Sequence, residues 1–414
     1  MKDSSSGSSF MLVCNRIVVM MVICLVCTGC NQIVDNSGAD VTRTTLENGI
    51  TLIHYSKLPV EADTLAGDLF IGVAEGEDAY MFGDIRGIEA DNDGNVYVFD
   101  YQATDIRVFD NQGIYLKTIA TKGPGPAEIT EANGMVLKGD SILWVHDYRQ
   151  NQIKGFSKHG KLLDAFPPHV RSYGYIFSGV IDDNGLYWKS SSRGNSPRQA
   201  QPDEGLLESS GEAVIISLNP KTLLQDTLSM GRFSGASYVA KIDRGFSFYG
   251  IPFRSGNVSV VHPKGGFWRG INDTYEIVRL NSEGDSLFVI KVEMDTRQVT
   301  VEDERTFKEG MIARSPDLGV IAEEIAALMP SHKPLIQDLI VDDEGRLWVQ
   351  HQSDAGEPVR YDVFDDNGVF LKSLVLGFGV APYFPIRHRN GRVYGLNLDS
   401  LSVPIVVRSE QFAF

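Results

Sequence analysis

The chain has 414 residues, of which 43% are hydrophobic and 22% are charged, and its formal net charge at pH 7 is −16. This composition is that of a folded globular protein and excludes a disordered or collagen-like chain. The acidic balance, without any Lys- or Arg-rich run, argues against a nucleic-acid partner, which requires clustered basic side chains. Length alone suggests two or three domains, but one closed β-propeller can also absorb a chain of this length.

The first 29 residues have the pattern of a secretory signal. Lys2 and Arg16 precede an apolar run over residues 17–28. This run is too short for a spanning helix, which needs about 20 apolar residues. A charged start, a short apolar stretch and small residues at its end predict a signal peptide over residues 1–29. The sequence leaves open whether translation starts at Met1 or Met11.

The apolar run ends in Leu25-Val26-Cys27-Thr28-Gly29-Cys30. This resembles a bacterial lipobox, although Cys27 stands where a lipobox usually has Leu. The resemblance implies that Cys30 carries a lipid and begins a mature chain of 385 residues, with residues 30–43 as a tether. Removal of Lys2, Asp3 and Arg16 changes the net charge from −16 to −17. The alternative is ordinary signal cleavage and a free periplasmic protein.

All four cysteines lie within the first 30 residues, so the mature chain keeps only Cys30. We therefore expect no disulfide and no cysteine catalysis. Asn31 follows the cysteine, where Asp is associated with retention in the inner membrane. By that resemblance we expect an envelope protein of the outer membrane, and the sequence leaves its periplasmic or surface face open.

A repeated unit is clearest over residues 85–119. Alternation of apolar and polar residues predicts four short strands over residues 87–90, 95–100, 105–110 and 114–119. The turns DNDG and DNQG supply the positive φ angles that tight hairpins need. Four strands in about 45 residues are typical of one propeller blade.

One aromatic position fixes the number of units. An aromatic residue follows the first turn of each unit, and these positions include all four tryptophans: Tyr97, Trp144, Trp188, Trp268, Trp348 and Tyr394. We interpret these aromatics as packing between neighbouring sheets and not as a ligand cage. The sequence therefore predicts an all-β fold, a six-bladed β-propeller of four-stranded blades with a short helical insertion, over residues 44–414.

The last unit supplies only three strands, so the ring should be closed by an N-terminal strand within residues 65–73, with residues 50–55 as an extra outer strand. Three segments interrupt the repeat. Residues 191–212 are rich in Ser, Gly and Pro and suggest a loop, and residues 231–254 suggest irregular structure. Residues 301–329 show a helical pattern that Pro316 divides into two helices.

Three stretches carry a resemblance to a known family: DNDGNVYVFD at residues 91–100, residues 123–128, and SHKPLIQDLIVDDEGRLWV at residues 331–349. They resemble NHL-like or TolB-like six-bladed propellers, in particular a bacterial family of exported propeller lipoproteins with no assigned activity. The resemblance covers residues 61–414 and is specific for fold, not for function. It departs from the family's GxGPxE pattern, since Pro126 replaces a Gly and Ala127 is inserted before Glu128.

Catalytic and metal motifs are weak. Asp91-Asn92-Asp93-Gly94-Asn95 begins like a calcium loop but lacks the terminal Glu, so we interpret it as a turn. The eight histidines show no zinc spacing. His146 and His351 lie near the ends of second strands in different blades. The two histidines could share one site, or each could be a solvent-exposed residue of the rim. We predict no cofactor.

The remaining candidates lie where second strands end and blades connect: Asp100, Tyr101, Lys122, Asp147, Tyr148, Arg149, His351 and Asn397. Asp100-Tyr101 and Asp147-Tyr148 occupy the same phase of the repeat. Hydrogen bonds that cap the blades would explain the two aspartates equally well. The alternatives of a ligand site and a structural role both stay open.

The sequence favours a monomeric binding or scaffold module on the cell envelope, with a protein, peptide or glycan ligand that it does not identify. The alternative is a metal-dependent propeller hydrolase or lyase, similar to the lactonase-like propellers, which hold a divalent metal on the channel axis. Side chains that converge in the central channel would favour catalysis.

Overall fold

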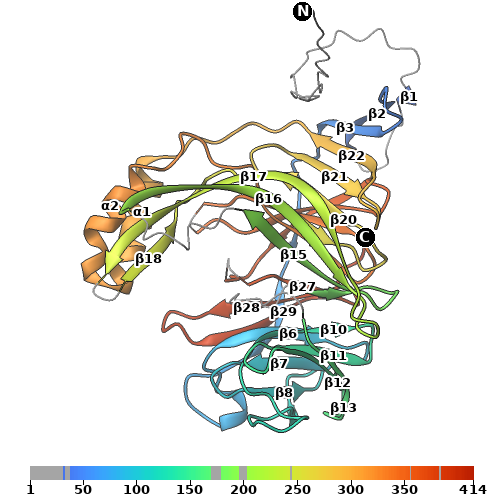
Figure 1. Cartoon of the computed structure of the whole chain (residues 1–414), viewed down its shortest axis with the longest axis vertical. Coiled ribbons are helices and arrows are strands. Elements are labelled where there is room, and N and C mark those ends of the chain that lie inside the picture. Colours follow the sequence, from blue (N-terminus) through green and yellow to red (C-terminus); the bar gives the residue numbers. More distant parts are fainter. Residues whose placement is uncertain are drawn as a thin grey trace, which may run out of the picture.

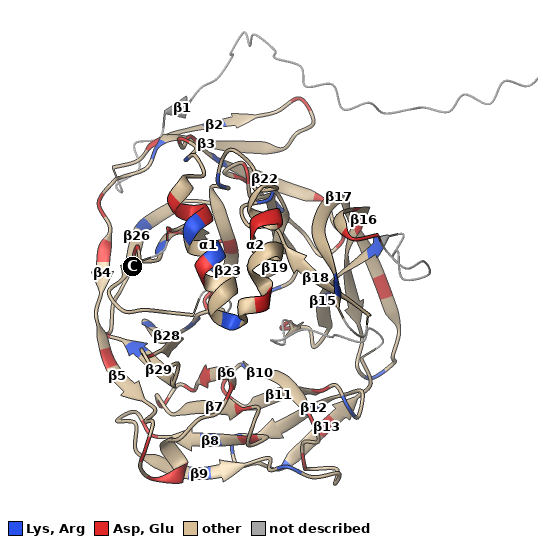
Figure 2. Cartoon of the chain, turned by 90° about the vertical axis from the view of Figure 1, so that its left-hand side faces the viewer, with Lys and Arg blue, Asp and Glu red and all other residues tan. Residues whose placement is uncertain are grey.

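The computed structural model describes residues 31–32, 38–168, 179–194, 203–242, 245–354, 356–381 and 384–414. Its strands form six sheets, which confirms the predicted six-bladed β-propeller. Figure 1 labels the strands in a side view of the ring, and the sheets are seen around a common axis in Figure 2. The first strands of neighbouring blades contact one another and therefore lie nearest the axis. Cys30 lies outside the described residues, so its lipidation stays a prediction.

Blades 1 and 2 each consist of four antiparallel strands. Their bounds are β6 (Ile85–Ala90), β7 (Val96–Asp100), β8 (Asp105–Phe109), β9 (Tyr115–Ile119), β10 (Ala132–Lys138), β11 (Ile142–Asp147), β12 (Gln152–Ser157) and β13 (Leu162–Phe166). Blade 3 has a fifth strand: β14 (Val180–Ile181), β15 (Tyr187–Gly194), β16 (Gly205–Leu218), β17 (Gln225–Ile242) and β18 (Gly245–Gly250).

Blades 4, 5 and 6 continue the ring. Their bounds are β19 (Asn257–Val261), β20 (Phe267–Ile271), β21 (Glu276–Leu280), β22 (Ser286–Val292), β23 (Ile336–Val341), β24 (Leu347–His351), β25 (Arg360–Phe364), β26 (Phe370–Leu376), β27 (Arg387–Arg389), β28 (Arg392–Leu398) and β29 (Pro404–Ser409). Blade 6 thus draws only three strands from the end of the chain.

The aromatic of each second strand is buried, with at most 7% of its surface exposed, so its predicted packing role is confirmed. In three blades it also hydrogen-bonds an aspartate of the first turn. Trp188 and Trp348 donate from Nε1 to Asp182 and Asp342 over 2.8 and 2.9 Å, and Tyr97 donates to Asp91 over 3.0 Å. The aspartate therefore links the turn to the core between blades.

The Asp91 turn is filled by protein donors. One carboxylate oxygen of Asp91 accepts the backbone N–H groups of Asp93 and Asn95 over 3.0 and 2.8 Å. The other accepts Tyr97 and the Asn95 side chain, and Lys158 lies 3.2 Å away. These contacts are the hydrogen bonds of a turn and leave little room for calcium coordination.

The N-terminal segment closes the ring and then continues around its outer edge. β5 (Gly67–Ile71) pairs antiparallel with β29 and completes blade 6, which confirms the closure expected within residues 65–73. β4 (Asp63–Leu65) adds in parallel to β26 of blade 5, and β3 (Thr51–Lys57) adds in parallel to β22 of blade 4. β2 (Asp40–Thr45) pairs with β3 and with β1 (Asn31–Gln32), so part of the expected tether is strand.

One face of the propeller, here named the turn face, carries the tight turns between the first and second strands. Side chains and backbone groups of these turns bridge every junction between neighbouring blades. The bridges are Asn92–Asp140, Lys138–Asp183, Asp183–Pro263, His262–Gly345, Asp343–His388 and Asn390–Asn92. Because this ring of contacts is continuous, the turn face is tied together around the axis.

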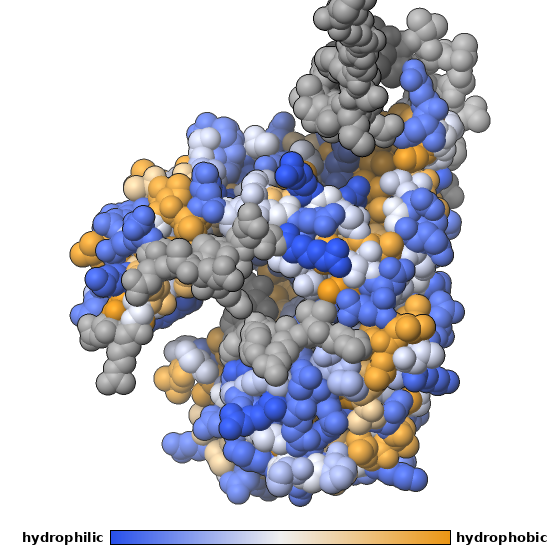
Figure 3. Space-filling model, viewed as in Figure 1, coloured by the Kyte–Doolittle hydropathy of each residue, from blue (hydrophilic) through white to orange (hydrophobic). Residues whose placement is uncertain are grey.

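The opposite face, named the loop face, carries the links from second to third strands and from blade to blade. Here β16, β17 and β18 extend beyond blade 3 and pack against α1 (Val301–Arg314) and α2 (Gly319–Ala326), with a 3-10 turn, η3 (Pro316–Leu318), between the helices. Figure 2 looks onto this face, with both helices in front of the sheets. In Figure 3 the resulting arm projects to the left above a hollow.

The arm confirms one expectation and corrects two. The two helices within residues 301–329, separated at Pro316, are confirmed. The expected loop over residues 191–212 is wrong for residues 191–194 and 205–212, which are strand. The expected irregular segment 231–254 is also wrong, because β17 and β18 occupy residues 231–242 and 245–250. Burial of Tyr238 and Ala240 against the helices supplies the apolar contact that these Gly- and Ser-rich strands lack locally.

Within the part of the chain described, no helix combines the length and the apolar character needed to cross a membrane.

Candidate functional site

Four of the predicted rim residues occupy one structural position. Asp100, Asp147, His351 and Asn397 each lie three residues after the buried aromatic of a second strand, where that strand reaches the loop face. In blades 1, 2 and 5, the residue two positions before this one on the second strand pairs with a charged residue of the third strand. These third-strand residues are Arg107, Lys154 and Asp362. The structure thus brings a charged pair together inside each of these three blades.

In blade 1 the pair is structural. The Asp100 carboxylate accepts the backbone N–H groups of Gly83 and Asp84 over 3.0 and 3.2 Å, and that of Gln102 over 3.0 Å. Arg107 lies 3.4 Å from the same carboxylate and donates to the Met81 carbonyl over 2.6 Å. Because Asp100 is buried and occupied by these donors, it caps the link that enters blade 1.

Blade 2 repeats this arrangement with Lys154 in place of arginine. Asp147 accepts the N–H groups of Thr130 and Gln150 over 2.9 and 3.2 Å. Lys154 Nζ lies 3.3 Å from Asp147 Oδ2 and donates to the Glu128 carbonyl over 2.6 Å. Both side chains of the pair are fully buried, so neither can contact a ligand in this state.

The neighbouring tyrosines form a cluster between blades 1 and 2. The hydroxyl groups of Tyr101 and Tyr148 both donate to Glu131, and they lie 3.3 Å from each other. These two hydrogen bonds lower the pKa of Glu131, whereas burial and the bond to Glu131 raise the pKa of Tyr148. Arg149 lies 3.7 Å from Glu131, and Arg86 stacks on the Tyr101 ring at 3.3 Å.

Lys122 and Asn397 lie apart from that cluster. Lys122 belongs to the link between blades 1 and 2, where its backbone forms an isolated bridge with Ile129. Asn397 lies at the loop-face end of β28, close to Gly379. No hydrogen bond or ion pair among the described residues joins either side chain to the tyrosine cluster or to His351.

Blade 5 reverses the polarity of the charged pair. His351 occupies the second-strand position and Asp362 the third-strand position, with His351 Nε2 and Asp362 Oδ2 2.6 Å apart. Asp362 also accepts Tyr275 Oη over 2.9 Å and Ser373 Oγ over 2.6 Å. Burial alone would raise the pKa of Asp362, but the hydrogen bonds from His351 and Ser373 hold it below its ordinary value. The imidazole is thereby fixed by an ionised, buried carboxylate.

His351 lines a cavity of about 540 Å³ on the loop face, here named the His351 pocket. Such a volume lies within the range of about 300–1,000 Å³ that small-molecule sites occupy. The walls come from four separate stretches: residues 294–297 after β22, residues 334–335 before β23, residues 351–353 and 357–360 from the end of β24 to the start of β25, and Val375 of β26. Apolar and charged side chains therefore meet in one concave surface.

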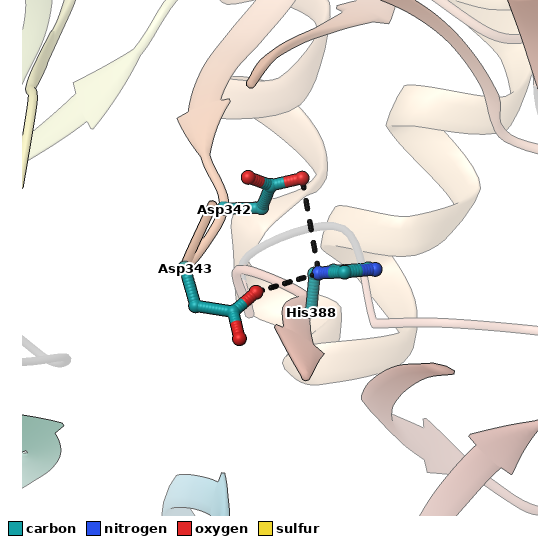
Figure 4. A group of neighbouring side chains, drawn as sticks. All are labelled: Asp342, Asp343 and His388. Carbon is teal, nitrogen blue, oxygen red and sulfur yellow. Dashed lines mark hydrogen bonds and ion pairs between the residues drawn. The ribbon is translucent and has the colours of Figure 1, made fainter. Parts of the chain in front are cut away.

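A second group has the composition of a metal site but is already neutralised. Asp342, Asp343 and His388 place one ligand atom each within 4.8 Å of one another (Figure 4). Asp342, however, accepts Trp348 Nε1 over 2.9 Å and Arg346 Nε over 2.7 Å. Arg389 lies 3.5 Å from Asp343. These cations and donors satisfy the carboxylates, so the group is best described as an interblade ion-pair network of the turn face.

The central channel carries charge without a converging ligand set. Glu89 of β6 pairs with Arg387 of β27 at 2.9 Å, and burial raises the pKa of Glu89 despite that partner. On β23, Asp338 is solvent-accessible yet confined by surrounding protein, and desolvation raises its pKa to about 6. Among the described residues, Asp342, Asp343 and His388 are the only grouping of three His, Cys, Asp or Glu ligands.

The two histidines considered together from the sequence have different surroundings. His351 lines the pocket of blade 5, whereas His146 is buried on β11 of blade 2. Burial and the nearby Lys189 ammonium lower the pKa of His146 to about 4, and burial lowers the pKa of Lys189 to about 8. The structure gives no common site for His146 and His351.

Sequence reasoning missed Asp362, the partner that defines the site. Its signal was present in the repeat, because RYDVF of blade 5 carries an aspartate where IRVF and IKGF of blades 1 and 2 carry Arg107 and Lys154. The acidic Asp362 at a position that is basic in blades 1 and 2 indicates that the charges of the pair are exchanged in blade 5. The exchange is visible in the sequence only when the third strands of the blades are compared position by position.

Comparison with a family model supports the fold. Residues 71–202 match a family model (DUF5128) described as a 6-bladed beta-propeller. A structure of a putative exported protein from Bacteroides fragilis is similar, with 10% identity, 85% of this chain and 99% of that chain covered, and a TM-score of 0.45. A member of the DUF4221 family from Bacteroides vulgatus has 10% identity, coverage of 84% and 98%, and a TM-score of 0.43.

A gluconolactonase from Xanthomonas campestris is also similar, with 12% identity, coverage of 80% and 87%, and a TM-score of 0.38. No curated protein matches the chain.

Proposed function

We propose that this six-bladed β-propeller is a binding module of the bacterial cell envelope, held on a membrane by a lipid on Cys30, and that its ligand occupies the His351 pocket. The observation that carries the proposal is the cavity of about 540 Å³ on the loop face, lined by a histidine that a buried carboxylate orients. The ligand is a protein segment, a peptide or a glycan that presents a small amphipathic group.

The rim carboxylates of blades 1 and 2 are less suited to bind a ligand than His351, because protein groups already occupy them. Asp100 and Asp147 are buried and occupied by backbone N–H groups, and Glu131 is shared by two tyrosines. A metal-dependent hydrolase or lyase is the weaker candidate, because the described channel residues bring no three metal ligands together on the axis. The ring of contacts on the turn face favours a rigid platform that presents its ligand on the loop face.

The pocket can be tested with one blocking variant and one matched control. Met294 lines the pocket with 37% of its surface exposed, and Leu163, on the outer strand of blade 2, is 49% exposed. The full-length chain, M294W and L163W are applied in mild detergent to a synthetic peptide array and a glycan array. Binding that M294W abolishes and L163W retains supports the proposal. Absence of binding on both arrays, or binding that M294W leaves unchanged, overturns it.

The anchor is tested separately. Cells that express the wild type or Cys30→Ala are fed an alkyne fatty acid, and the protein is detected after fractionation. The wild type should carry the label and sediment with membranes, whereas C30A should lose the label and enter the soluble fraction. An unlabelled wild-type protein would refute the lipid anchor and leave the pocket unaffected.

A further inference from the structure

The exchanged pair in blade 5 gives the His351 pocket its chemical preference, an inference that rests on the proposed function. In blades 1 and 2 the second-strand carboxylate caps backbone N–H groups of the preceding link. His351 stands at the same position in blade 5 but has no such role. Its Nε2 is taken by Asp362, and Nδ1 has no hydrogen bond to any described residue. In the neutral imidazole the Nε2–H group donates to Asp362, and Nδ1 is then an acceptor in a residue that lines the pocket.

The basic groups of the pocket are already engaged by protein acceptors, and the one Arg360 donor without a hydrogen bond, Nε, is buried. Arg297 donates to Glu357 over 3.1 Å, lies 3.4 Å from Asp354, and also donates to the Gln352 carbonyl. Arg360 donates to the carbonyl groups of Val60 and Pro59 over 2.9 and 3.2 Å and to Ser373 over 2.9 Å. An anionic ligand would therefore compete with the protein acceptors that already hold both guanidinium groups, at a cost in affinity.

The acceptors of the pocket, in contrast, are in excess. Asp295 is exposed, and no described residue makes a hydrogen bond or ion pair with it. Glu357 uses one oxygen for Arg297 and for the Asp354 N–H group, which leaves the other for a ligand. Together with His351, two carboxylates thus surround a space whose fixed groups can accept hydrogen bonds.

The remaining walls are apolar. Met294, Pro334, Leu335, Pro358 and Val375 line the same cavity. A cation placed among the acceptors would lie next to these side chains, so its stem should be aliphatic. The net charge of −16 also raises the local concentration of cations around the protein.

We propose that the His351 pocket selects an ammonium or guanidinium group on an apolar stem. Two sources share this chemistry: a basic side chain of a peptide, and a free amphipathic amine. His351, Asp295 and Glu357 accept the hydrogen bonds of the cation, and the apolar wall contacts its stem. Asp362 acts through His351 as a positioning residue.

The test uses the full-length chain in mild detergent and fluorescence anisotropy. The probe is a fluorescein-labelled peptide, Ala-Leu-Lys-Leu-Ala-amide with an acetylated N-terminus, and the matched probe carries acetyl-lysine instead of lysine. The lysine peptide should bind at least about tenfold more tightly, because a hydrogen bond to a charged group adds about 1.5–3 kcal/mol. Equal affinity of the two probes overturns the inference. Unlabelled hexylamine distinguishes the sources, since displacement identifies a free amine as sufficient and its absence identifies the peptide.

Three variants assign the contacts. D295N should weaken binding about two- to fivefold, as for an exposed charge pair, and D226N, an exposed aspartate of blade 3, should leave it unchanged. H351Q keeps an N–H donor for Asp362 but lacks the imidazole Nδ1, and should weaken binding more than about tenfold. Equal effects of D295N and D226N overturn the assignment. If M294W abolishes binding of both probes while their affinities are equal, the cation preference fails and the proposed function stands.

Discussion

The buried ion pair of blade 2 gives the sharpest test of the structural interpretation of Asp147. Lys154→Met keeps an unbranched stem of similar length but removes the ammonium that lies 3.3 Å from Asp147 and 2.6 Å from the Glu128 carbonyl. Both partners are fully buried, so the variant leaves a carboxylate without its counterion in a region of low dielectric. Breaking such a pair costs about 3–5 kcal/mol of unfolding free energy.

Urea unfolding followed by tryptophan fluorescence measures this loss, and Trp144 lies on the adjacent strand β11. The matched control is Lys138→Met, because the Lys138–Asp183 pair lies at the surface, with 61% of the aspartate side chain exposed. The control should change stability by less than about 1 kcal/mol. A loss below about 1 kcal/mol for K154M would refute the reasoning, because Asp147 would then not depend on Lys154 and could serve a ligand.

Three further predictions concern the folded ring. Burial holds the pKa of His146 near 4, below the ordinary value of about 6.5, so the unfolded chain binds this proton first and stability falls as pH decreases between those values. His146→Leu should remove up to about 3 kcal/mol of that decline when the unfolding free energies of wild type and variant are plotted against pH. Parallel curves for the two proteins would contradict this prediction. The pKa of Asp338 is raised to about 6, so the ionisation of this carboxyl group destabilises the fold as pH rises. In calorimetry, Asp338→Asn should therefore raise the melting temperature at pH 8 and leave it unchanged at pH 3.5. Ile71→Ala in the closing strand should cost about 2–5 kcal/mol in urea unfolding, whereas the 58% exposed Phe70→Ala should cost far less; equal losses would argue against β5 as the closure.

The architecture was readable because each blade repeats a locally determined pattern. The aromatic of the second strand and the Gly-containing turns depend on neighbours within the same blade, so their phase gives the number of blades directly. The missing fourth strand of the last unit predicted closure by residues 65–73, since an open edge has to be paired. The arm was misread because β17 owes its burial to helices from another link, and its Gly- and Ser-rich sequence has no strong strand pattern.

The site was readable only in part, because its chemistry depends on partners distant in the sequence. The common phase of Asp100 and Asp147 was visible, but the N–H groups that occupy them come from residues 83–84 and 130–131. His351 was a candidate, whereas its buried partner Asp362 resembled any other aspartate. The pocket itself joins four stretches of chain, a proximity that no local pattern encodes.

Hydrogen–deuterium exchange of the full-length chain, with and without the lysine peptide, shows whether a ligand occupies the His351 pocket. We expect the peptide to slow exchange at the backbone amides of residues 294–297, 335, 351–353, 357 and 360, which belong to the stretches that line the His351 pocket. Unchanged exchange in these stretches, or protection confined to the Tyr101–Tyr148 rim of blades 1 and 2, would contradict the assignment of the His351 pocket as the ligand site.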